Sequence, residues 1–231
     1  MSTDSNPQVF TDVTMDPFVR GLLHRPANPN GDGIVLSHGA GSNCQAPLLV
    51  ALAQTFADAG FVVLRVDLPY RQDRPYGPPG PGDAKRDRAG LKNAVAAIRG
   101  LAKGRVFLGG HSYGGRQSSM LCAELAEEAA GRAPELVAGL LLLSYPLHPP
   151  RKPDQLRTQH FFNLHTRALF VEGTRDPFAS IAEIEQALKL IPAETRLMPV
   201  EGVGHDLGFK GKVGREALAG NVLAEFQAFF A

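Results

Sequence analysis

A serine flanked by glycines lies near the middle of the chain. Residues 109–115 read Gly-Gly-His-Ser-Tyr-Gly-Gly, so Gly110 and Gly114 stand two positions before and two positions after Ser112. In a Gly-x-Ser-x-Gly pattern the chain turns from a strand into a helix so sharply that neither flanking position has room for a side chain. Such a turn strains the backbone of the serine and exposes its hydroxyl. The pattern therefore predicts that Ser112 is a nucleophile.

A serine hydroxyl becomes an effective nucleophile when a base removes its proton and a carboxylate orients that base. Of the histidines that follow Ser112, His205 is the best placed, because it lies directly after the last predicted strand and before the last predicted helix. The other three, His148, His160 and His165, lie within or beside a proline-containing segment in which no strand end fixes them. We expect His205 to be the base, with an exposed loop histidine as the alternative.

The expected carboxylate is Asp176, which follows a predicted strand by a tight turn in the segment Glu-Gly-Thr-Arg-Asp-Pro. Asp206 is adjacent to His205 and would point elsewhere, and Asp154 has no strand end before it. The alternative for Asp176 is the N-terminal cap of a helix that begins near Pro177, a common structural role for aspartate. We favour the catalytic role, in which the carboxylate holds His205 in one tautomer and stabilises its charged form.

The carbonyl that such a serine attacks develops negative charge on its oxygen, and backbone N–H groups commonly stabilise this oxyanion. Tyr113, the residue after the nucleophile, is expected to supply one N–H group. The small-residue turn from His38 to Gly41 follows a predicted strand and is expected to supply the second N–H group, from Ala40. Together these residues predict two-step acyl transfer onto Ser112 and then to water.

The residues around these motifs predict alternating strands and helices. Short apolar runs predict two strands within residues 8–25 and further strands at 33–37, 61–66, 105–108, 136–143, 168–172 and 196–200. Helical spacing predicts helices over 46–59, 83–102, 113–130, 180–190 and 213–230. Residues 68–82 are dense in proline and glycine, and they are expected to form a surface loop without a regular element.

This alternation predicts an α/β fold in which a mostly parallel central sheet of about eight strands has helices on both faces. Most strands read as continuous apolar runs, which is typical of strands that are covered on both sides. No linker or internal repeat divides the chain, so residues 1–231 are expected to form a single domain. Too few residues separate the strands at 136–143 and 168–172 for a large cap domain. We expect an open site walled by residues 145–166 and 68–82.

Composition excludes several classes of protein. The net charge of +1 gives no reason to expect nucleic acid or an acidic membrane as a partner. No apolar run is long enough to span a bilayer, and the first residues do not resemble a signal peptide. The two cysteines, Cys44 and Cys122, are expected to be reduced thiols. We therefore expect a cytoplasmic protein that uses no metal and no cofactor. The sequence carries no signal of its oligomeric state.

The motifs taken together resemble a known superfamily. The segments HGAGSN, GGHSYGG, EGTRDP and GVGHD, in this order, are similar to those of α/β hydrolases. Within that superfamily the chain resembles the compact, cap-less bacterial hydrolases related to dienelactone hydrolases, from about Gly33 to Ala231. The superfamily includes esterases, thioesterases, peptidases and acyltransferases, so the resemblance implies acyl transfer without selecting one reaction. We expect a small acyl substrate, an ester or a thioester. Dienelactone hydrolases carry a cysteine nucleophile where this chain has Ser112, which argues against dienelactone itself as the substrate.

Two arginines are candidates for substrate binding. Basic residues outnumber acidic ones between Arg65 and Arg105, and such a run is usually a solvated face. Arg71 lies in the loop after a predicted strand and is expected to bind a carboxylate of the substrate. Arg116, one turn into the helix that follows Ser112, is a second candidate, with a structural role as its alternative.

Two other classes of function fit part of the sequence. Gly39, Gly41 and Cys44 follow a strand and open a helix, and Asp67 ends the next strand, which is similar to a dinucleotide-binding unit. The third glycine of that motif is missing, however, and Asp67 lies farther along the chain than the motif requires. The other alternative is a catalytically silent interaction module that retains the fold. A silent scaffold has no physical need for a serine in a strained turn.

Overall fold

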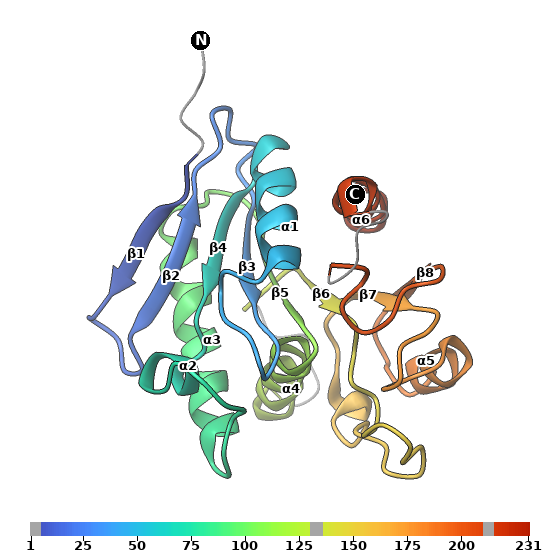
Figure 1. The fold of residues 1–231 in the computed structure, drawn as a ribbon. Helices are drawn as coiled ribbons and strands as arrows, with labels where there is room; N and C mark the ends of the chain where they lie inside the picture. Colours follow the sequence, from blue (N-terminus) through green and yellow to red (C-terminus); the bar gives the residue numbers. More distant parts are fainter. Residues whose placement is uncertain (1–5, 130–135, 210–214) are drawn as a thin grey trace.

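The computed structural model describes residues 6–129, 136–209 and 215–231. Within them, strands and helices alternate along the chain (Figure 1). The strands are β1 (Gln8–Asp12), β2 (Val19–His24), β3 (Gly33–Ser37), β4 (Val62–Val66), β5 (Val106–His111), β6 (Gly139–Leu143), β7 (Ala168–Gly173) and β8 (Thr195–Val200). The helices are α1 (Pro47–Asp58), α2 (Pro69–Asp73), α3 (Asp83–Arg99), α4 (Tyr113–Glu128), α5 (Ile181–Leu188) and α6 (Arg215–Phe230), with a 3₁₀ turn at Phe161–Asn163.

The strands form one sheet in the order β1-β2-β4-β3-β5-β6-β7-β8. The pairs β1–β2 and β2–β4 are antiparallel, and every other neighbouring pair is parallel. All residues of β3, β4 and β6 are buried, as their continuous apolar sequences predict. The expected α/β fold with a mostly parallel sheet of eight strands is confirmed.

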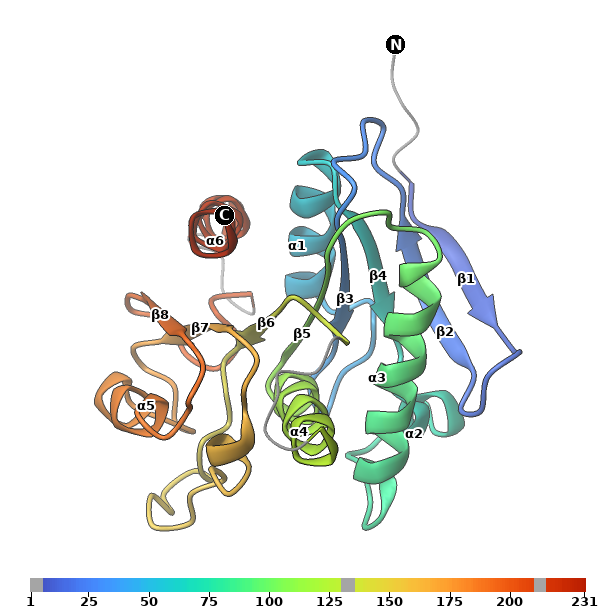
Figure 2. The same ribbon diagram turned by 180° about the vertical axis from the view of Figure 1, so that it is seen from behind.

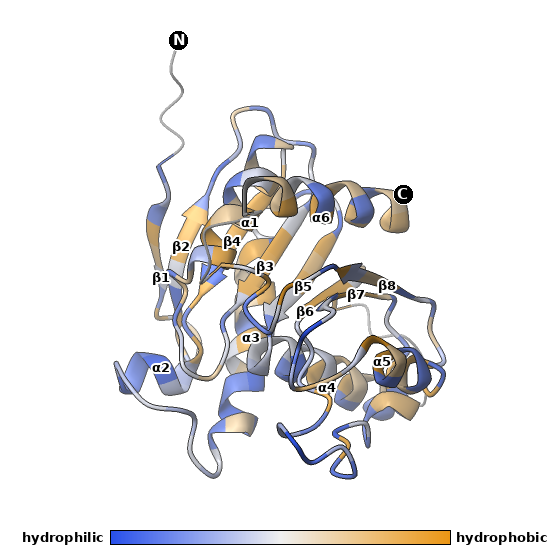
Figure 3. Ribbon diagram, turned by 45° about the vertical axis from the view of Figure 1, so that its right-hand side comes forward, coloured by the Kyte–Doolittle hydropathy of each residue, from blue (hydrophilic) through white to orange (hydrophobic). Residues whose placement is uncertain are grey.

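Helices cover both faces of this sheet. On one face α1 and α6 pack together over β3 and β5, where an aromatic cluster centres on Phe226 with Phe56, Phe61 and Phe107. On the other face α3, α4 and α5 bury a second apolar core (Figure 2). Apolar residues accordingly concentrate in the strands and on the inner sides of the helices, whereas α2 and the outer loops are polar (Figure 3).

Some element boundaries differ from those expected. The expectation that residues 68–82 contain no regular element was wrong at their start, where α2 forms. Pro69 fits there because the first N–H groups of a helix have no intrahelical acceptor, so proline loses no hydrogen bond. The strand expected from residue 136 begins at Gly139. The predicted end of one helix at residue 130 and the predicted start of the last helix at residue 213 lie outside the described residues.

The connection between β6 and β7 contains no cap domain, as predicted: apart from the 3₁₀ turn it is a chain of turns and irregular segments. Among the described residues, no helix is both long enough and apolar enough to cross a membrane. Cys44 and Cys122 are buried and unpaired.

The direction of winding changes between β3 and β5. The chain leaves β3 through α1 on one face and continues to β4, whereas it leaves β5 through α4 on the other face and continues to β6. The carboxyl ends of β3 and β5 lie side by side while their following segments diverge, which opens a crevice where α/β proteins commonly bind ligands. The turn that begins at His38 and the turn at Ser112 therefore meet at this edge.

Candidate active site

Ser112 occupies the sharp turn between β5 and α4. Its backbone has a φ of 50° and a ψ of −113°, a conformation that costs a non-glycine residue about 1–3 kcal/mol. Close packing explains both flanking glycines. A Cβ atom at Gly110 would lie 2.3 Å from Ser37 Oγ, and one at Gly114 would lie 2.6 Å from the carbonyl oxygen of His38. The turn at Ser112 is thus packed closely against the end of β3, and the Ser112 hydroxyl faces His205.

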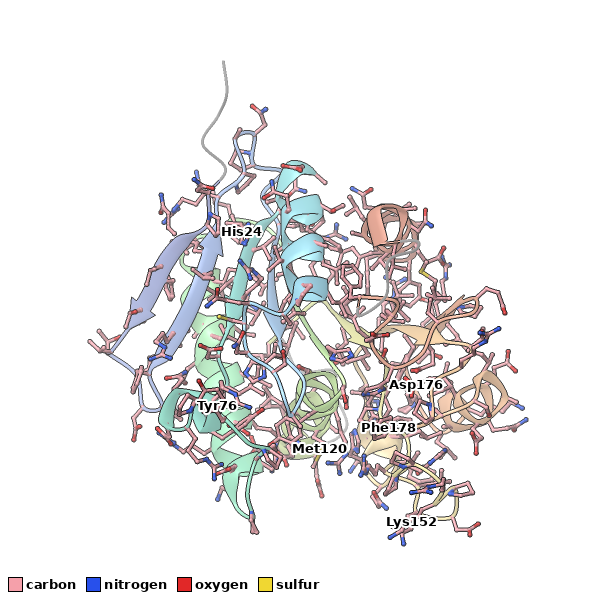
Figure 4. All side chains as sticks on the ribbon, in the orientation of Figure 1. His24, Tyr76, Met120, Lys152, Asp176 and Phe178 are labelled. Carbon is pink, nitrogen blue, oxygen red and sulfur yellow. The ribbon has the colours of Figure 1, made fainter. Side chains whose placement is uncertain are left out.

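The three residues predicted to act together converge on this turn. Nε2 of His205 lies 2.8 Å from Ser112 Oγ, and Nδ1 of His205 lies 2.7 Å from Asp176 Oδ2. The Asp176 side chain has no solvent exposure, whereas 23% of the His205 side chain is exposed. Solvent or a substrate therefore reaches the imidazole but not the carboxylate behind it. Figure 4 labels Asp176 on the loop that follows β7.

The surroundings of Asp176 favour the ionised form of its carboxyl group. Burial acts to raise the pKa of Asp176, but hydrogen bonds with His205 and Glu172 outweigh burial and leave this pKa below its ordinary value. The backbone N–H of Phe178 also donates to Asp176 Oδ1 at 2.8 Å. This last bond closes a short turn and does not cap a helix, because the next helix, α5, begins at Ile181 and has Ser180 as its N-cap. The alternative role of Asp176 as the cap of a helix near Pro177 was therefore wrong, and its other oxygen contacts His205.

Two residues that sequence reasoning missed orient His205. The ring of Phe178 stacks beside the imidazole, with ring centroids 4.2 Å apart and an interplanar angle of 31°. On another side, Nε2 of His111 lies 2.7 Å from the backbone carbonyl oxygen of His205. Burial lowers the pKa of His111 to about 4, so this ring is neutral and donates from Nε2. His111 is the variable residue before the serine, and nothing in the Gly-x-Ser-x-Gly pattern marks it.

The backbone around the two expected oxyanion donors, Ala40 and Tyr113, is fixed by hydrogen bonds and by the start of a helix. In the turn after β3, the carbonyl oxygen of Gly39 accepts hydrogen bonds from His38 Nδ1 at 2.9 Å and from the N–H of Ser42 at 3.0 Å. The carbonyl of Gly39 and the N–H of Ala40 belong to one trans peptide and point in opposite directions, so these bonds also fix the direction of the Ala40 N–H. Tyr113 is the first residue of α4, where an N–H has no intrahelical acceptor.

A buried aspartate connects the two donor segments. Asp87, on α3, accepts a hydrogen bond from the Tyr113 hydroxyl at 2.7 Å and from the backbone N–H of Tyr70 at 3.1 Å. The hydroxyl of Tyr70 in turn donates to the carbonyl oxygen of Ala40 at 2.8 Å. Sequence reasoning missed this bridge, because Asp87 reads as one more charged residue of an amphipathic helix.

Arg71 contacts the turn from His38 to Gly41, the expected oxyanion turn, and does not line the candidate site. Its guanidinium donates to the carbonyl oxygens of Ala40 and Ser42, at 3.2 and 2.7 Å, and to those of Arg74 and Gly77, at 3.0 and 2.7 Å. Arg71 is only 5% exposed, and its donors are engaged by the backbone. The expected contact between Arg71 and a substrate carboxylate is therefore corrected. The folding of residues 69–73 into α2 turns this side chain back against the chain.

Arg116 is likewise not among the described residues that line the space beside Ser112. Its backbone N–H donates to the carbonyl oxygen of Ser112 at 2.9 Å, in the first turn of α4. Its side chain is partly buried, and Nε has no hydrogen-bond partner among the described residues. The structure thus gives Arg116 no contact with the space next to the serine.

A cavity of about 450 Å³ opens beside the serine. Its walls come from the turn after β3, the start of α1, the sharp turn at Ser112 (the elbow) and the loop around His205. The described lining residues are Gly39, Ala40, Gly41, Ser42, Ala46, Pro47, Leu48, Leu49, His111, Ser112, Phe178, His205, Asp206 and Phe209. None comes from 145–166 or 68–82, so the expectation that these segments wall the site was wrong. Tyr145 and Phe161 instead belong to the apolar core on the face of the sheet that α3, α4 and α5 cover.

The dinucleotide alternative does not fit this arrangement. Asp67, which would have to bind a ribose, accepts the backbone N–H of Cys44 at 2.8 Å and lies 3.6 Å from Arg20. One edge of the sheet also consists of two antiparallel pairs, β1–β2 and β2–β4, unlike the all-parallel order of a dinucleotide-binding sheet.

Comparison with known proteins agrees with this architecture. Residues 31–229 match a family described as alpha/beta hydrolase domain. Among solved structures, the chain is similar to an α/β serine hydrolase homologue from Coxiella burnetii, with 14% identity, coverage of 97% of this chain and 99% of that chain, and a TM-score of 0.71. It is also similar to a dienelactone hydrolase from Anabaena variabilis, with 20% identity, coverage of 97% and 99%, and a TM-score of 0.71.

A third similar structure is an α/β serine hydrolase without a lid from Xanthomonas campestris, with 13% identity, coverage of 99% of this chain and 97% of that chain, and a TM-score of 0.67. At such identities the structural similarity shows the fold alone. The family match, in contrast, covers most of the chain from the second half of the β2–β3 connection to the end of α6. The protein therefore belongs to the α/β-hydrolase family.

Proposed function

We propose that this protein is a serine hydrolase that cleaves a carboxylic ester or thioester through an acyl-enzyme intermediate. The observation that carries the proposal is the continuous hydrogen-bonded chain from Ser112 through His205 to Asp176. It begins at a strained serine and ends on a buried carboxylate. A nucleophile, its base and the group that orients the base are the parts that acyl transfer requires.

In the first step, Nε2 of His205 takes the proton of Ser112 as Oγ attacks the carbonyl carbon of the substrate. The carbonyl oxygen becomes negatively charged and receives hydrogen bonds from the N–H groups of Ala40 and Tyr113. His205 then gives its proton to the departing alkoxide or thiolate, which leaves an ester on Ser112. Because the N–H groups are fixed before the charge develops, little reorganisation opposes their action.

In the second step, a water molecule attacks the ester on Ser112 while His205 accepts its proton. Collapse of this second tetrahedral intermediate releases the carboxylic acid, and the proton returns from His205 to Ser112. Asp176 remains ionised throughout and stabilises the imidazolium that forms in each step. This sequence leaves the enzyme unchanged and needs no cofactor.

The walls of the cavity favour an uncharged substrate. Ala46, Pro47, Leu48, Phe178 and Phe209 present apolar surface, and no lysine or arginine is among the described lining residues. Among the described lining residues, the carboxylate is that of Asp206, which would repel an anionic substrate. We therefore propose neutral esters or thioesters with an apolar acyl group, in place of the acidic esters that a role for Arg71 implied.

Turnover of paired substrates tests this proposal. We expect the wild-type protein to hydrolyse neutral 4-nitrophenyl esters of short and medium chain length with a higher kcat/KM than a matched ester that carries a free carboxylate. Ser112→Ala should abolish this turnover. Ser42→Ala is the matched control, because Ser42 lines the same cavity without a hydrogen bond from its side chain to the triad. A Ser112→Ala variant that is folded and fully active would overturn the proposal.

A further inference from the structure

Ser112, His205 and Asp176 form the candidate triad, and a buried glutamate is the neighbour of its aspartate. Glu172, near the end of β7, has no solvent exposure, and Oε2 accepts a hydrogen bond from the backbone N–H of Tyr145 at 2.8 Å. The other oxygen, Oε1, is also buried and finds no N–H or O–H donor among the described residues. A side-chain hydrogen bond joins the carboxyl groups of Glu172 and Asp176, and the backbone N–H of Gly173 also hydrogen-bonds to Glu172.

Two adjacent buried carboxyl groups cannot both be ionised without strong repulsion, and one shared proton removes the conflict. The surroundings decide which group carries the proton. Asp176 receives hydrogen bonds from His205 Nδ1 at 2.7 Å and from the Phe178 N–H at 2.8 Å, and both favour its ionised form. Glu172 is completely buried, and its Oε1 has no hydrogen-bond donor among the described residues. Burial first, and then the proximity of Asp176, raise the pKa of Glu172 far above its ordinary value.

We propose that Glu172 is a neutral, proton-carrying positioning residue: its carboxyl group donates a hydrogen bond to Asp176 and so holds that carboxylate ionised and aimed at His205. The inference rests on the proposed function, because it assigns a task within the same site. It extends the chain of hydrogen bonds by one member, from Ser112 through His205 and Asp176 to Glu172. It also explains how a glutamate is accommodated at a fully buried strand position.

The other charged groups near the pair are few. His205 and Asp206 lie on the loop after β8, His111 ends β5, and Tyr145, after β6, presents its backbone N–H. Near the start of α5, Glu183 lies 3.5 Å from His148. Within the described residues, no lysine or arginine forms an ion pair or hydrogen bond with Glu172 or Asp176. The proton on Glu172 is therefore the group that relieves the repulsion.

The chemical benefit is specific to a neutral donor. A hydrogen bond to Asp176 lowers the rotational freedom of the carboxylate without placing a second negative charge near His205. An ionised Glu172 would raise the pKa of His205 and hold the base protonated to higher pH. Glutamine has the shape of glutamate and also donates from its side chain, so it should replace Glu172 in this role. Methionine has a similar length and donates nothing.

Infrared spectroscopy of the folded protein tests the proton directly. We expect the C=O stretching band of a protonated carboxylic acid at pH 8 in the wild type, where ordinary glutamates are ionised. The band should vanish from Glu172→Gln, persist in Ser112→Ala and disappear when the wild type is unfolded. Asp87→Asn is the matched control for another buried carboxyl whose pKa burial raises. Absence at pH 8 of any band that Glu172→Gln removes would overturn the inference.

The pH dependence of kcat/KM tests the positioning role. Glu172→Gln should keep the midpoint of the acidic limb unchanged and keep kcat near that of the wild type. Glu172→Met should lower kcat by on the order of 10-fold or more with little change in KM, because Asp176 loses its orientation. A Gln variant whose acidic limb moves to lower pH would show that an ionised glutamate had been removed, and would contradict the inference.

The inference and the proposed function fail in distinguishable ways. The infrared band needs no substrate and no activity, and its measurement on the wild type does not depend on how any variant folds. A band assigned to Glu172 in a protein without hydrolytic activity would remove the proposed function and leave the shared proton in place. Hydrolysis without the band would leave the function and remove the role of Glu172.

Discussion

At the scale of single residues, the site depends on how Asp176 holds the His205 ring. With Nδ1–H donating to Asp176 Oδ2, the other ring nitrogen, Nε2, is free to accept the proton of Ser112. The tautomer is thus set by one hydrogen bond 2.7 Å long. A neutral amide in place of the carboxylate offers an N–H group as well as an oxygen, and can stabilise the wrong tautomer.

We therefore expect Asp176→Asn to lower kcat by about 10³- to 10⁴-fold with a much smaller change in KM. The measurement is the steady-state hydrolysis of a neutral ester by the wild type and the variant. The melting temperature of the variant should be recorded in parallel. A folded variant that retains more than a tenth of the wild-type kcat would show that Asp176 does not orient the base.

The proton on Glu172 also links stability to pH. The pKa of Glu172 is raised in the folded protein, whereas the unfolded chain ionises near the ordinary glutamate pKa. Between these two values the folded state binds one proton more than the unfolded state, so its stability falls as pH rises by about 1.4 kcal/mol per pH unit from this group.

Glu172→Gln removes this dependence, since an amide does not titrate. We expect the free energy of unfolding of the variant minus that of the wild type to become more positive as the pH is raised from about 5.5 to 8. Denaturant unfolding at several pH values measures this difference. A difference that stays constant over the range would mean that Glu172 ionises normally in the folded protein.

At the scale of elements, the sharp turn at Ser112 between β5 and α4 requires close contact of β5 with β3 and with the start of α4. A Cβ at Gly110 would lie 2.3 Å from Ser37 Oγ and 2.7 Å from the backbone of Gly115, so both a strand and a helix would have to move. Gly220 in α6 is the opposite case, since a Cβ there would meet nothing within 4 Å.

We expect Gly110→Ala to destabilise the protein by at least about 1–3 kcal/mol and to displace the serine. Gly220→Ala, in an open helical position, should instead stabilise it by roughly 0.5–1 kcal/mol. Thermal and denaturant unfolding of both variants measure the contrast. Equal effects of the two substitutions would contradict the close packing of the elbow.

Asp87 connects α3 to both segments that are proposed to carry the oxyanion donors. Replacement by alanine leaves the Tyr113 hydroxyl and the Tyr70 N–H without their acceptor, and each buried unsatisfied group costs about 1–3 kcal/mol. We expect Asp87→Ala to lower both stability and kcat. Tyr113→Phe, which removes only one of the two contacts, should have the smaller effect on both quantities. An Asp87→Ala variant with unchanged kcat would show that the bridge does not support the donors.

At the scale of the whole molecule, the two apolar layers hold the sheet edge that carries the site, but they do not form its chemistry. The ring of Phe226 packs against Phe56, Phe61 and Phe107 on the face covered by α1 and α6, at centroid distances of 5.1, 5.9 and 4.8 Å. Phe226 does not line the cavity. Loss of this ring therefore separates the stability of the scaffold from the activity of the site.

We expect Phe226→Ala to cost about 3–5 kcal/mol of stability while the kcat/KM of the remaining folded protein stays close to that of the wild type. Phe162→Ala is a control of the same type at a side chain that is 61% exposed, and it should change stability by less than about 0.5 kcal/mol. A Phe226→Ala variant that is stable but inactive would place the aromatic cluster within the site.

Patterns in the sequence predicted the features that depend on local spacing. Continuous apolar runs indicated a buried parallel sheet, and the two glycines around Ser112 indicated the elbow. The contacts that depend on distant residues had no local signal. Glu172 reads as one polar residue in an apolar strand, although it is completely buried. Arg71 reads as a loop cation available to a substrate, although it binds four backbone carbonyl oxygens.

Local sequence patterns also could not predict which residues line the cavity beside Ser112. Residues 46–49 begin a helix that the sequence predicted, yet their place beside Ser112 follows from the change of winding direction between β3 and β5. That change is a property of the strand order. Periodicity indicates that a strand is buried, but it does not indicate which strands are its neighbours.

The central claim is that Ser112 is activated as a nucleophile by His205. Its most direct test is the intact mass of the folded protein after treatment with a fluorophosphonate, for the wild type, Ser112→Ala and Ser42→Ala. We predict a single adduct on the wild type and on Ser42→Ala, and none on Ser112→Ala or on the unfolded wild type. An unlabelled wild type, or an adduct that persists in folded Ser112→Ala, would contradict the account.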